Sequence, residues 1–243
     1  MVKLMVMSHT YRQSSDASEK LRERDPFNRL LARQSRFRLD AEMVRDNALA
    51  VSGLLADKIG GPSVKPYQPA GYWDQLNFPK RTYQNDHGES AYRRGLYTFW
   101  CRTFVHPSMV AFDAATREEC TVERVTSNTP LQALVLLNDP TYVEAARVFA
   151  AKIMTDGGGS VDDRINWTFA RALERKPRPE EQRKLSELYH KQLDHYAADK
   201  DSAEKLVSVG DWAVNKELNV AELAAWTSVA RVMLNLNETI ARY

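Results

Sequence analysis

Cysteine is scarce in this chain of 243 residues, and its placement excludes several familiar sites. Cys101 and Cys120 lie nineteen positions apart, and the chain has no C-x-x-C, C-x-x-C-H or paired Cys/His spacing. A zinc finger, a thioredoxin-like motif and a covalent haem c attachment are therefore excluded within it. Two alternatives stay open for the pair: one disulfide in an oxidising compartment, or two small buried apolar side chains.

Long hydrophobic runs and an excess of one charge are also missing. The most apolar stretch, Leu131 to Leu137, is interrupted by Gln132 and is too short for a membrane-spanning helix. The stretch after Lys3 is too short for the hydrophobic region of a signal peptide. The 34 Lys and Arg residues nearly balance the 32 Asp and Glu residues, which argues against a surface built for nucleic acid. No phosphate-binding loop, dinucleotide-binding glycine motif or G-x-S-x-G nucleophile motif occurs.

What the chain does have is helical periodicity. After Asp40, apolar residues recur at spacings of three and four, which predicts a helix that continues toward Gly60-Gly61-Pro62. Thr129-Pro130 and Asp139-Pro140 each pair a capping residue with proline, and they predict helices over about 130–137 and 140–154. Asp25-Pro26 predicts a further helix start by the same rule.

The chain beyond residues 157–160 is expected to be purely helical. Cap pairs at Ser160/Asp163 and Asn219/Glu222 precede apolar stripes. Gly157 to Ser160 is the clearest linker, so we predict a helical part over 1–156 and a second over 157–243 packed on it, or one single domain. The fold class is mainly α: an irregular helical bundle with at most a minor β element. Leu96 to Trp100 favours a strand by propensity but is too short to separate from a buried helix turn.

Residues 60–92 form a long irregular region rich in proline and aromatics. A structureless segment of this length is unusual in a compact domain and is often functional. We expect its aromatic side chains to pin it against the core. The residues concerned are Pro62, Pro66, Pro69, Pro79, Tyr67, Tyr72, Trp73, Phe78 and Tyr83.

Arginines are concentrated between residues 22 and 38. Guanidinium groups grip phosphate or sulfate oxygens in a two-point fork, so these residues are candidate binding groups for phosphates or sulfated sugars. The simpler alternative is that they pair with the protein's own carboxylates, such as Asp40, Glu42, Asp46 and Asp113. The four binding candidates are Arg29, Arg33, Arg36 and Arg38.

Two further groups of polar residues are candidates for chemistry. His87 lies between Asp86 and Glu89 and could serve as a general base or ligate a metal, although a solvated turn is the simpler interpretation and we predict no metal site. Asp113 and Arg124 could line a cleft with Asn128 and Gln132, or form a salt bridge that braces two corners. The catalytic candidates are therefore Asp113, Arg124, His87 and Glu89, with Asn128 and Gln132 as further binding candidates.

Several blocks of the sequence resemble one known family. The chain is similar to the planctomycete PSD domain, domain-of-unknown-function family 1553, over essentially its whole length. The most specific block is Asn128-Thr129-Pro130-Leu131-Gln132-Ala133-Leu134, and the others are residues 10–15, 25–33, 38–42, 60–64, 93–97, 112–114, Cys120, Trp226 and 234–239.

The resemblance implies context rather than a reaction. Such domains usually end long exported proteins, behind a companion domain and often a c-type cytochrome module, so haem c would belong to upstream modules and a periplasmic or extracellular location is expected. The family supplies no catalytic residues to carry over. The typical domain begins upstream of Met1, so we expect a fragment that is truncated at its N-terminus.

These implications predict an accessory or scaffold domain of an exported, cytochrome-associated bacterial protein, in contact with polysaccharide or a redox partner. We expect no nucleic-acid partner and no membrane span. The alternative is a hydrolase- or lyase-like enzyme that acts on an extracellular polymer.

Overall fold

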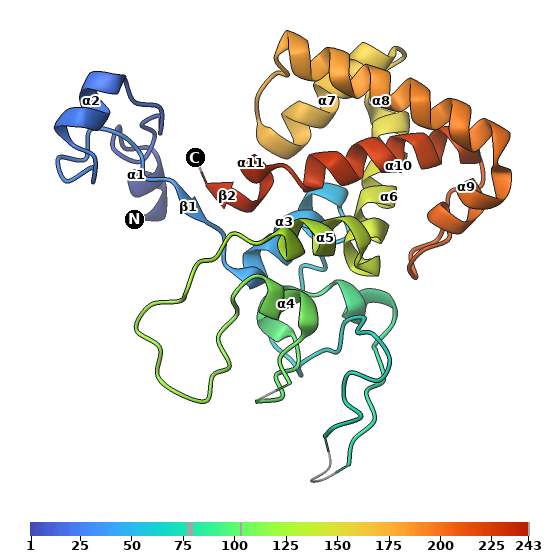
Figure 1. The fold of residues 1–243 in the computed structure, drawn as a ribbon, viewed down its shortest axis with the longest axis horizontal. Helices are drawn as coiled ribbons and strands as arrows, with labels where there is room; N and C mark the ends of the chain where they lie inside the picture. The colour runs from blue at the N-terminus through green and yellow to red at the C-terminus, as the bar shows by residue number, and fades with distance from the viewer. Residues whose placement is uncertain (77–79, 103, 243) are drawn as a thin grey trace.

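The computed structural model of the chain describes residues 1–76, 80–102 and 104–242, and its regular structure is almost entirely helical (Figure 1). This confirms the predicted fold class. The α-helices are α1 (Val2–Val6), α2 (Glu19–Arg24), α3 (Ala41–Ser52), α4 (Pro107–Ala111), α5 (Pro130–Asn138), α6 (Pro140–Asp156), α7 (Val161–Leu173), α8 (Pro179–Ala198), α9 (Lys200–Val207), α10 (Val220–Leu234) and α11 (Asn237–Ile240). Two 3-10 helices, η1 (Gly88–Tyr92) and η2 (Gly95–Tyr97), lie between α3 and α4.

The centre of the fold is the packing of α10 against α6, with α3, α8 and α9 around them. Alanines on the buried faces, among them Ala145, Ala146 and Ala230, let the helix backbones approach closely. The buried rings of Trp226 and Phe149 contact Tyr189 on α8 and Trp167 on α7. The hydrophobic core is one cluster that runs from Ala41 to Ile240. Burial of these apolar faces supplies most of the stability of such short helices, since short isolated helices are marginal in water.

Helix ends follow the capping residues that the sequence displays. The side chains of Ser160 and Asn219 accept hydrogen bonds from the backbone amides of Asp163 and Glu222, as predicted. The predicted proline starts of α5 and α6 are likewise confirmed. α3 ends earlier than predicted, because Gly53 adopts the left-handed conformation (φ 81°) that terminates a helix.

One local prediction is wrong, and one alternative that the sequence left open is decided. No helix follows Asp25-Pro26, because the Asp25 carboxylate accepts hydrogen bonds from the amides of Arg29 and Leu30 (both 2.8 Å) and closes a turn. The segment Leu96 to Trp100 forms no strand within the described part of the chain: it contains the end of η2 and a single bridge between Thr98 and Val64.

The minor β element lies elsewhere, near the two ends of the chain. Strand β1 (Phe37–Arg38) pairs antiparallel with β2 (Ala241–Arg242). Figure 1 shows that this pairing tethers an N-terminal arm, residues 1–36, which stands apart from the helical body. No residue of α1 or α2 is buried, so the arm contributes nothing to the core.

The irregular region 60–92 is held on the body partly by aromatic rings, as predicted. Trp73 is buried and packs edge-on against Tyr83 at 5.0 Å and beside Phe99 at 5.9 Å. Backbone bonds add to this, since Val64 exchanges hydrogen bonds with Tyr97 and Phe99. Phe78 and Pro79, named in the same prediction, lie outside the described residues.

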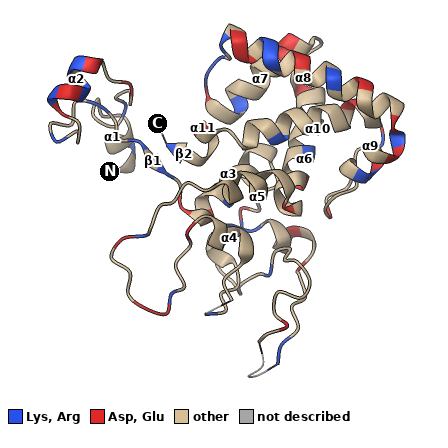
Figure 2. Cartoon of the chain, in the orientation of Figure 1, with Lys and Arg blue, Asp and Glu red and all other residues tan. Residues whose placement is uncertain are grey.

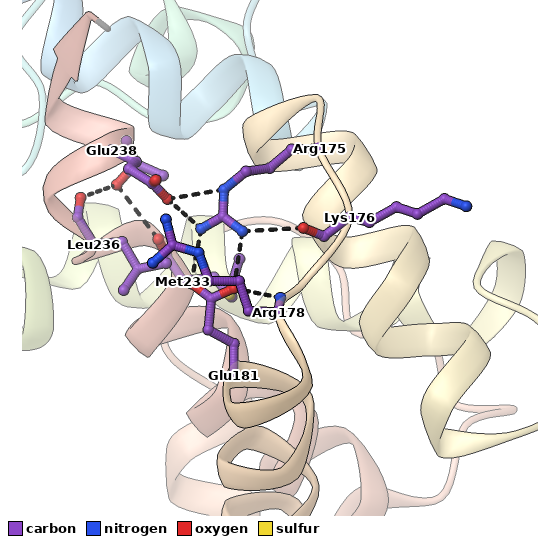
Figure 3. A network of polar contacts seen from close by, with 8 residues as sticks. Arg175, Lys176, Arg178, Glu181, Met233, Leu236 and Glu238 are labelled. Carbon is purple, nitrogen blue, oxygen red and sulfur yellow. Dashed lines mark hydrogen bonds and ion pairs between the residues drawn. The ribbon is translucent and has the colours of Figure 1, made fainter. Parts of the chain in front are cut away.

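Charged residues are frequent on α2 and on the outer helices α7, α8 and α9, while α5 and most of α10 carry few (Figure 2). A network of ion pairs fastens the α7–α8 turn to the end of the chain (Figure 3). Arg175 donates to Glu181 (2.8 Å) on α8 and to Glu238 (2.5 Å) on α11. Among the described helices, none is long and apolar enough to cross a membrane.

Candidate functional site

Four of the predicted site residues lie at one corner, between α3 and α5. Asp113 accepts hydrogen bonds from the amide (2.8 Å) and hydroxyl of Ser127, and Gln132 donates to the same serine. Gln132 also completes the predicted cap of α5 with Thr129, while Asn128 is exposed. These contacts fasten the ends of the loop between α4 and α5 rather than line a cleft.

The predicted salt bridge between Asp113 and Arg124 is replaced by a different pair. Arg124 forms a two-point contact with Glu42 on α3, at 2.7 and 3.2 Å. Burial would raise the pKa of Glu42, but the hydrogen bonds and charge of Arg124 outweigh it, so this pKa lies below its usual value. The pairing is structural, because it connects the α4–α5 loop to a core helix.

The arginines of the N-terminal segment also bond mainly to their own chain. Arg36 pairs with Asp16 (2.7 Å), and Arg33 donates to the carbonyl of Pro26 (2.9 Å). Arg38 donates to the carbonyl of Ser127 (2.8 Å), beside Asp113, while Arg29 is exposed on the arm. Arg33 and Arg36 line a cleft of about 450 Å³ on the arm, and Arg38 lies on the body, so the structure does not gather the four into one patch.

The two cysteines are both free thiols, with Cys101 half-buried and Cys120 exposed. Neither alternative open at the level of sequence therefore holds in the structure. Cys120 belongs to the exposed loop between α4 and α5, where nothing covers its side chain.

His87 and Glu89 lie on another part of the surface, beside the irregular region. His87 Nδ1 contacts the Asp211 carboxylate at 2.5 Å, although the two residues are 124 positions apart in the chain. Glu89 and Asp211 both line a cleft of about 460 Å³, together with Leu54 and Leu55. It is one of three neighbouring clefts, and we call it the third cleft; the first and second are described next. The structure thus brings these two sequence candidates together and adds Asp211 to them.

Two further clefts continue from this point along the irregular region. The second cleft, of about 210 Å³, shares Asp211 with the third and is lined by Asp86 and Glu144. The first cleft, of about 660 Å³, shares Tyr67 and Asn85 with the second. Because neighbouring clefts share wall residues, they follow one another along the surface, and we refer to the three together as the groove.

Aromatic, amide and charged residues line the first cleft, the charged ones being Asp74, Lys80 and Arg81. Its walls include Tyr67, Tyr72, Trp73 and Tyr83, with Gln68 buried among them. Two hydroxyls are fixed by backbone carbonyls: Tyr72 donates to Val105 (3.0 Å) and Tyr83 to Pro66 (2.5 Å). Burial raises the pKa of both phenols, so they remain neutral donors. Such a mixture of rings and placed polar groups is typical of a ligand cleft.

A buried polar cluster lies beneath the groove. Arg45 on α3 is wholly enclosed and donates to the carbonyl of Ala91 (2.6 Å), and nearby Tyr142 and Asp139 complete its surroundings. His106 is also buried and contacts the carbonyl of Tyr67 (2.6 Å). Burial, assisted by the charge of Arg45, lowers the pKa of His106 to about 4, so the imidazole is neutral near pH 7.

The second and third clefts depend on an ion pair in α6 that sequence reasoning missed. Glu144 accepts hydrogen bonds from the Tyr92 hydroxyl (2.8 Å) and the Trp212 amide (2.6 Å), and Arg147 donates to the Trp212 carbonyl (2.6 Å). Both charged side chains are buried. A signal for them existed, since Glu144 and Arg147 are charged residues within the most apolar part of the helix, but nothing in the sequence identified Trp212 as their partner.

The arrangement is suited to binding. Three of the groove carboxylates already have a partner within the chain: Asp86 accepts from the Lys65 amide, Glu144 from Trp212, and Asp211 contacts His87. Within the residues that the structure describes, no group of three or more His, Cys, Asp or Glu side chains could hold a metal ion.

Comparison with known proteins places the chain in a family. The model of the PSD1 family, described as Protein of unknown function (DUF1553), matches residues 1–189. The chain belongs to this family. The resemblance inferred from the sequence is thereby confirmed, and the PSD1 match ends inside α8, so the similar positions Trp226 and 234–239 lie beyond it. No curated protein and no solved structure matches the chain.

Proposed function

We propose that this PSD1 chain is a binding module that accompanies other domains in a larger protein, and that its groove holds a polysaccharide. The observation that carries this proposal is the row of three clefts with shared walls, because a row of subsites fits a chain of repeated units better than a single small molecule. The aromatic walls of the first cleft offer flat surfaces for sugar rings, and the neighbouring amide and carboxylate groups offer hydrogen-bond partners for hydroxyls.

Tyr67 is the residue to test first, because it lines both the first and the second cleft. We expect Tyr67→Ala to weaken binding to soluble neutral polysaccharides by about tenfold, measured by affinity electrophoresis and calorimetry. The truncation leaves its backbone bond to His106 in place. Phe27→Ala is the matched control, since Phe27 is an exposed aromatic on the arm, away from the groove. If the polysaccharide retards both variants as strongly as the wild type, the groove is not the binding site and the proposal is wrong.

A second candidate function is supported by the carboxylates of the second cleft. Asp86, Glu144 and Asp211 lie along one short stretch with His87 beside them, and paired carboxylates hydrolyse glycosidic bonds in many enzymes. The wild type should release no reducing ends and no unsaturated products from the polysaccharides that it binds. Product release that disappears in Asp211→Asn would establish the enzyme instead.

We further propose that the parent protein is exported and carries a cytochrome module upstream, so that any haem c belongs to that module and this domain contacts a redox partner or polysaccharide. The proposal rests on the family resemblance. Fractionation of source cells, with an antibody raised against this chain and a haem stain on the same band, tests it. A haem-free band confined to the cytoplasm would contradict it.

A further inference from the structure

Trp212 lies at the far end of the groove and is unusual in how it is held. The residue is 48% exposed, although tryptophan is normally much more buried. Its backbone, in contrast, is fixed at both polar groups, because Glu144 accepts from its amide and Arg147 donates to its carbonyl, each at 2.6 Å. An exposed ring on a rigid backbone loses little conformational freedom when a ligand packs on it.

Holding the Trp212 backbone in this way costs folding free energy, which argues against an incidental arrangement. Glu144 and Arg147 are both buried, and taking two charges out of water carries a desolvation penalty that their attraction only partly offsets. Gly210, two residues before Trp212, adopts φ +92°, and a side chain there would collide with the Glu144 carboxylate. The glycine and the ion pair together fix the backbone that carries this indole.

The surroundings of the ring indicate what it would bind. The indole contacts the edge of Tyr92 with ring centroids 5.8 Å apart and an interplanar angle of 76°. It belongs to the wall of the third cleft, whose floor is formed by Leu54, Leu55 and Ala56 and whose rim carries Glu89 and Asp211. An apolar floor and a flat ring fit the apolar face of a pyranose, and carboxylate oxygens accept hydrogen bonds from its hydroxyls.

We propose that Trp212 is the stacking platform of a distinct sugar subsite in the third cleft, which binds a neutral pyranose unit of the same chain that occupies the first cleft. This inference rests on the proposed polysaccharide function and adds the residue and the ligand class. A cationic side chain fits less well, because one exposed ring does not enclose a cation.

The test uses the full chain and neutral oligosaccharides of three and six units, of the β-1,4-linked glucan, xylan, mannan and N-acetylglucosamine types, measured by calorimetry. We expect the wild type to bind a hexasaccharide more tightly than the trisaccharide, because only the longer chain occupies both ends of the groove. Trp212→Ala should remove that gain, weakening the hexasaccharide by about tenfold and leaving the trisaccharide within about twofold. Trp212→Phe, which keeps a ring, should retain part of the gain.

The outcomes separate the two proposals. A hexasaccharide that is weakened by Tyr67→Ala but unaffected by Trp212→Ala leaves the polysaccharide function standing and overturns the subsite. Wild-type protein that binds none of the four hexasaccharides overturns both. Tight, Trp212-dependent binding of pentalysine would also overturn the sugar subsite, in favour of a cation site. Phe27→Ala is the control for general loss of an exposed ring, and thermal denaturation confirms that each variant is folded.

Discussion

Glu144 holds Trp212 by its backbone amide across 68 positions of sequence, with an N–O distance of 2.6 Å. The same carboxylate accepts from Tyr92, so one side chain of α6 joins η1 to the loop between α9 and α10. The groove therefore depends on the core, because its second and third clefts meet where a core helix fastens two surface segments. Loss of this carboxylate should affect both the stability of the fold and the shape of the groove.

The first prediction concerns that carboxylate. Glu144→Ala leaves Arg147 buried without its partner, and we expect a loss of about 3 kcal/mol in the free energy of unfolding, measured with urea. Glu187→Ala is the matched control: Glu187 pairs with Arg183 on the exposed face of α8 at 3.2 Å, and such pairs contribute about 0.5 kcal/mol or less. Similar losses for the two variants would show that burial of the Glu144–Arg147 pair does not increase its effect on the free energy of unfolding.

The second prediction concerns His106, whose pKa is lowered from 6.5 to about 4, first by burial and then by the charge of Arg45. Above pH 6.5 the imidazole is neutral in both the folded and the unfolded chain. Between pH 6.5 and 4 the unfolded chain binds a proton that the folded chain does not, so stability falls as the pH falls. We expect this group to remove up to about 3 kcal/mol across that window.

His106→Gln should abolish that component of the pH dependence in urea titrations between pH 7 and 4. The control is His190→Gln, because His190 is exposed on α8. A wild-type stability curve that stays as flat in this window as that of His106→Gln would contradict the neutral, buried imidazole.

The parts of the fold that the sequence predicts are those set by neighbouring residues. The caps at Thr129, Asp139, Ser160 and Asn219 act on amides two or three positions away, so a reader of the sequence can recognise them. The same kind of signal misled at Asp25, because its carboxylate caps a turn as readily as a helix. Local patterns therefore predict where capping groups lie better than they predict which structure follows.

The candidate site was predictable only in fragments, because its contacts are between distant residues. Arg124 has carboxylates of its own loop close by in sequence, yet it pairs with Glu42, 82 positions away. His87 and Glu89 were identified as polar residues in an unusual loop, but their neighbour Asp211 comes from the other end of the chain. Partner choice of this kind depends on how the helices pack, and a single sequence does not display it.

The third prediction concerns the ion pairs of Figure 3, in which Arg175 joins Glu181 to Glu238. The hydrogen bonds from Arg175 lower the pKa of Glu181 from 4.5 to about 2 despite partial burial. A lowered folded-state pKa stabilises the protein above the unfolded value near 4.5, and this contribution is lost as the pH falls from there toward 2. Because the glutamate is partly exposed, we expect it to contribute only about 1–2 kcal/mol.

Glu181→Gln should therefore lower the free energy of unfolding at pH 7 and converge with the wild type near pH 2. Glu187→Gln, on the exposed face of the same helix, should differ little from the wild type at either pH. The prediction fails if the difference between Glu181→Gln and the wild type is as large at pH 2 as at pH 7.

The last prediction concerns Gly95, where η2 approaches α3. A Cβ atom placed on Gly95 would lie 2.8 Å from the Cα of Glu42 and 2.9 Å from its carbonyl oxygen, and these backbone atoms cannot move without shifting the helix. The Gly95 amide also donates to Asp46 (2.6 Å), so the two segments are held at this separation. We expect Gly95→Ala to cost about 2 kcal/mol of stability, because overpacking of a close contact typically costs 1–3 kcal/mol.

Gly159→Ala is the matched control, since a Cβ there meets nothing within 4 Å. Thermal denaturation of the two variants tests this prediction. Equal melting temperatures would mean that η2 can move away from α3 freely, so that this contact would not fix the shape of the groove.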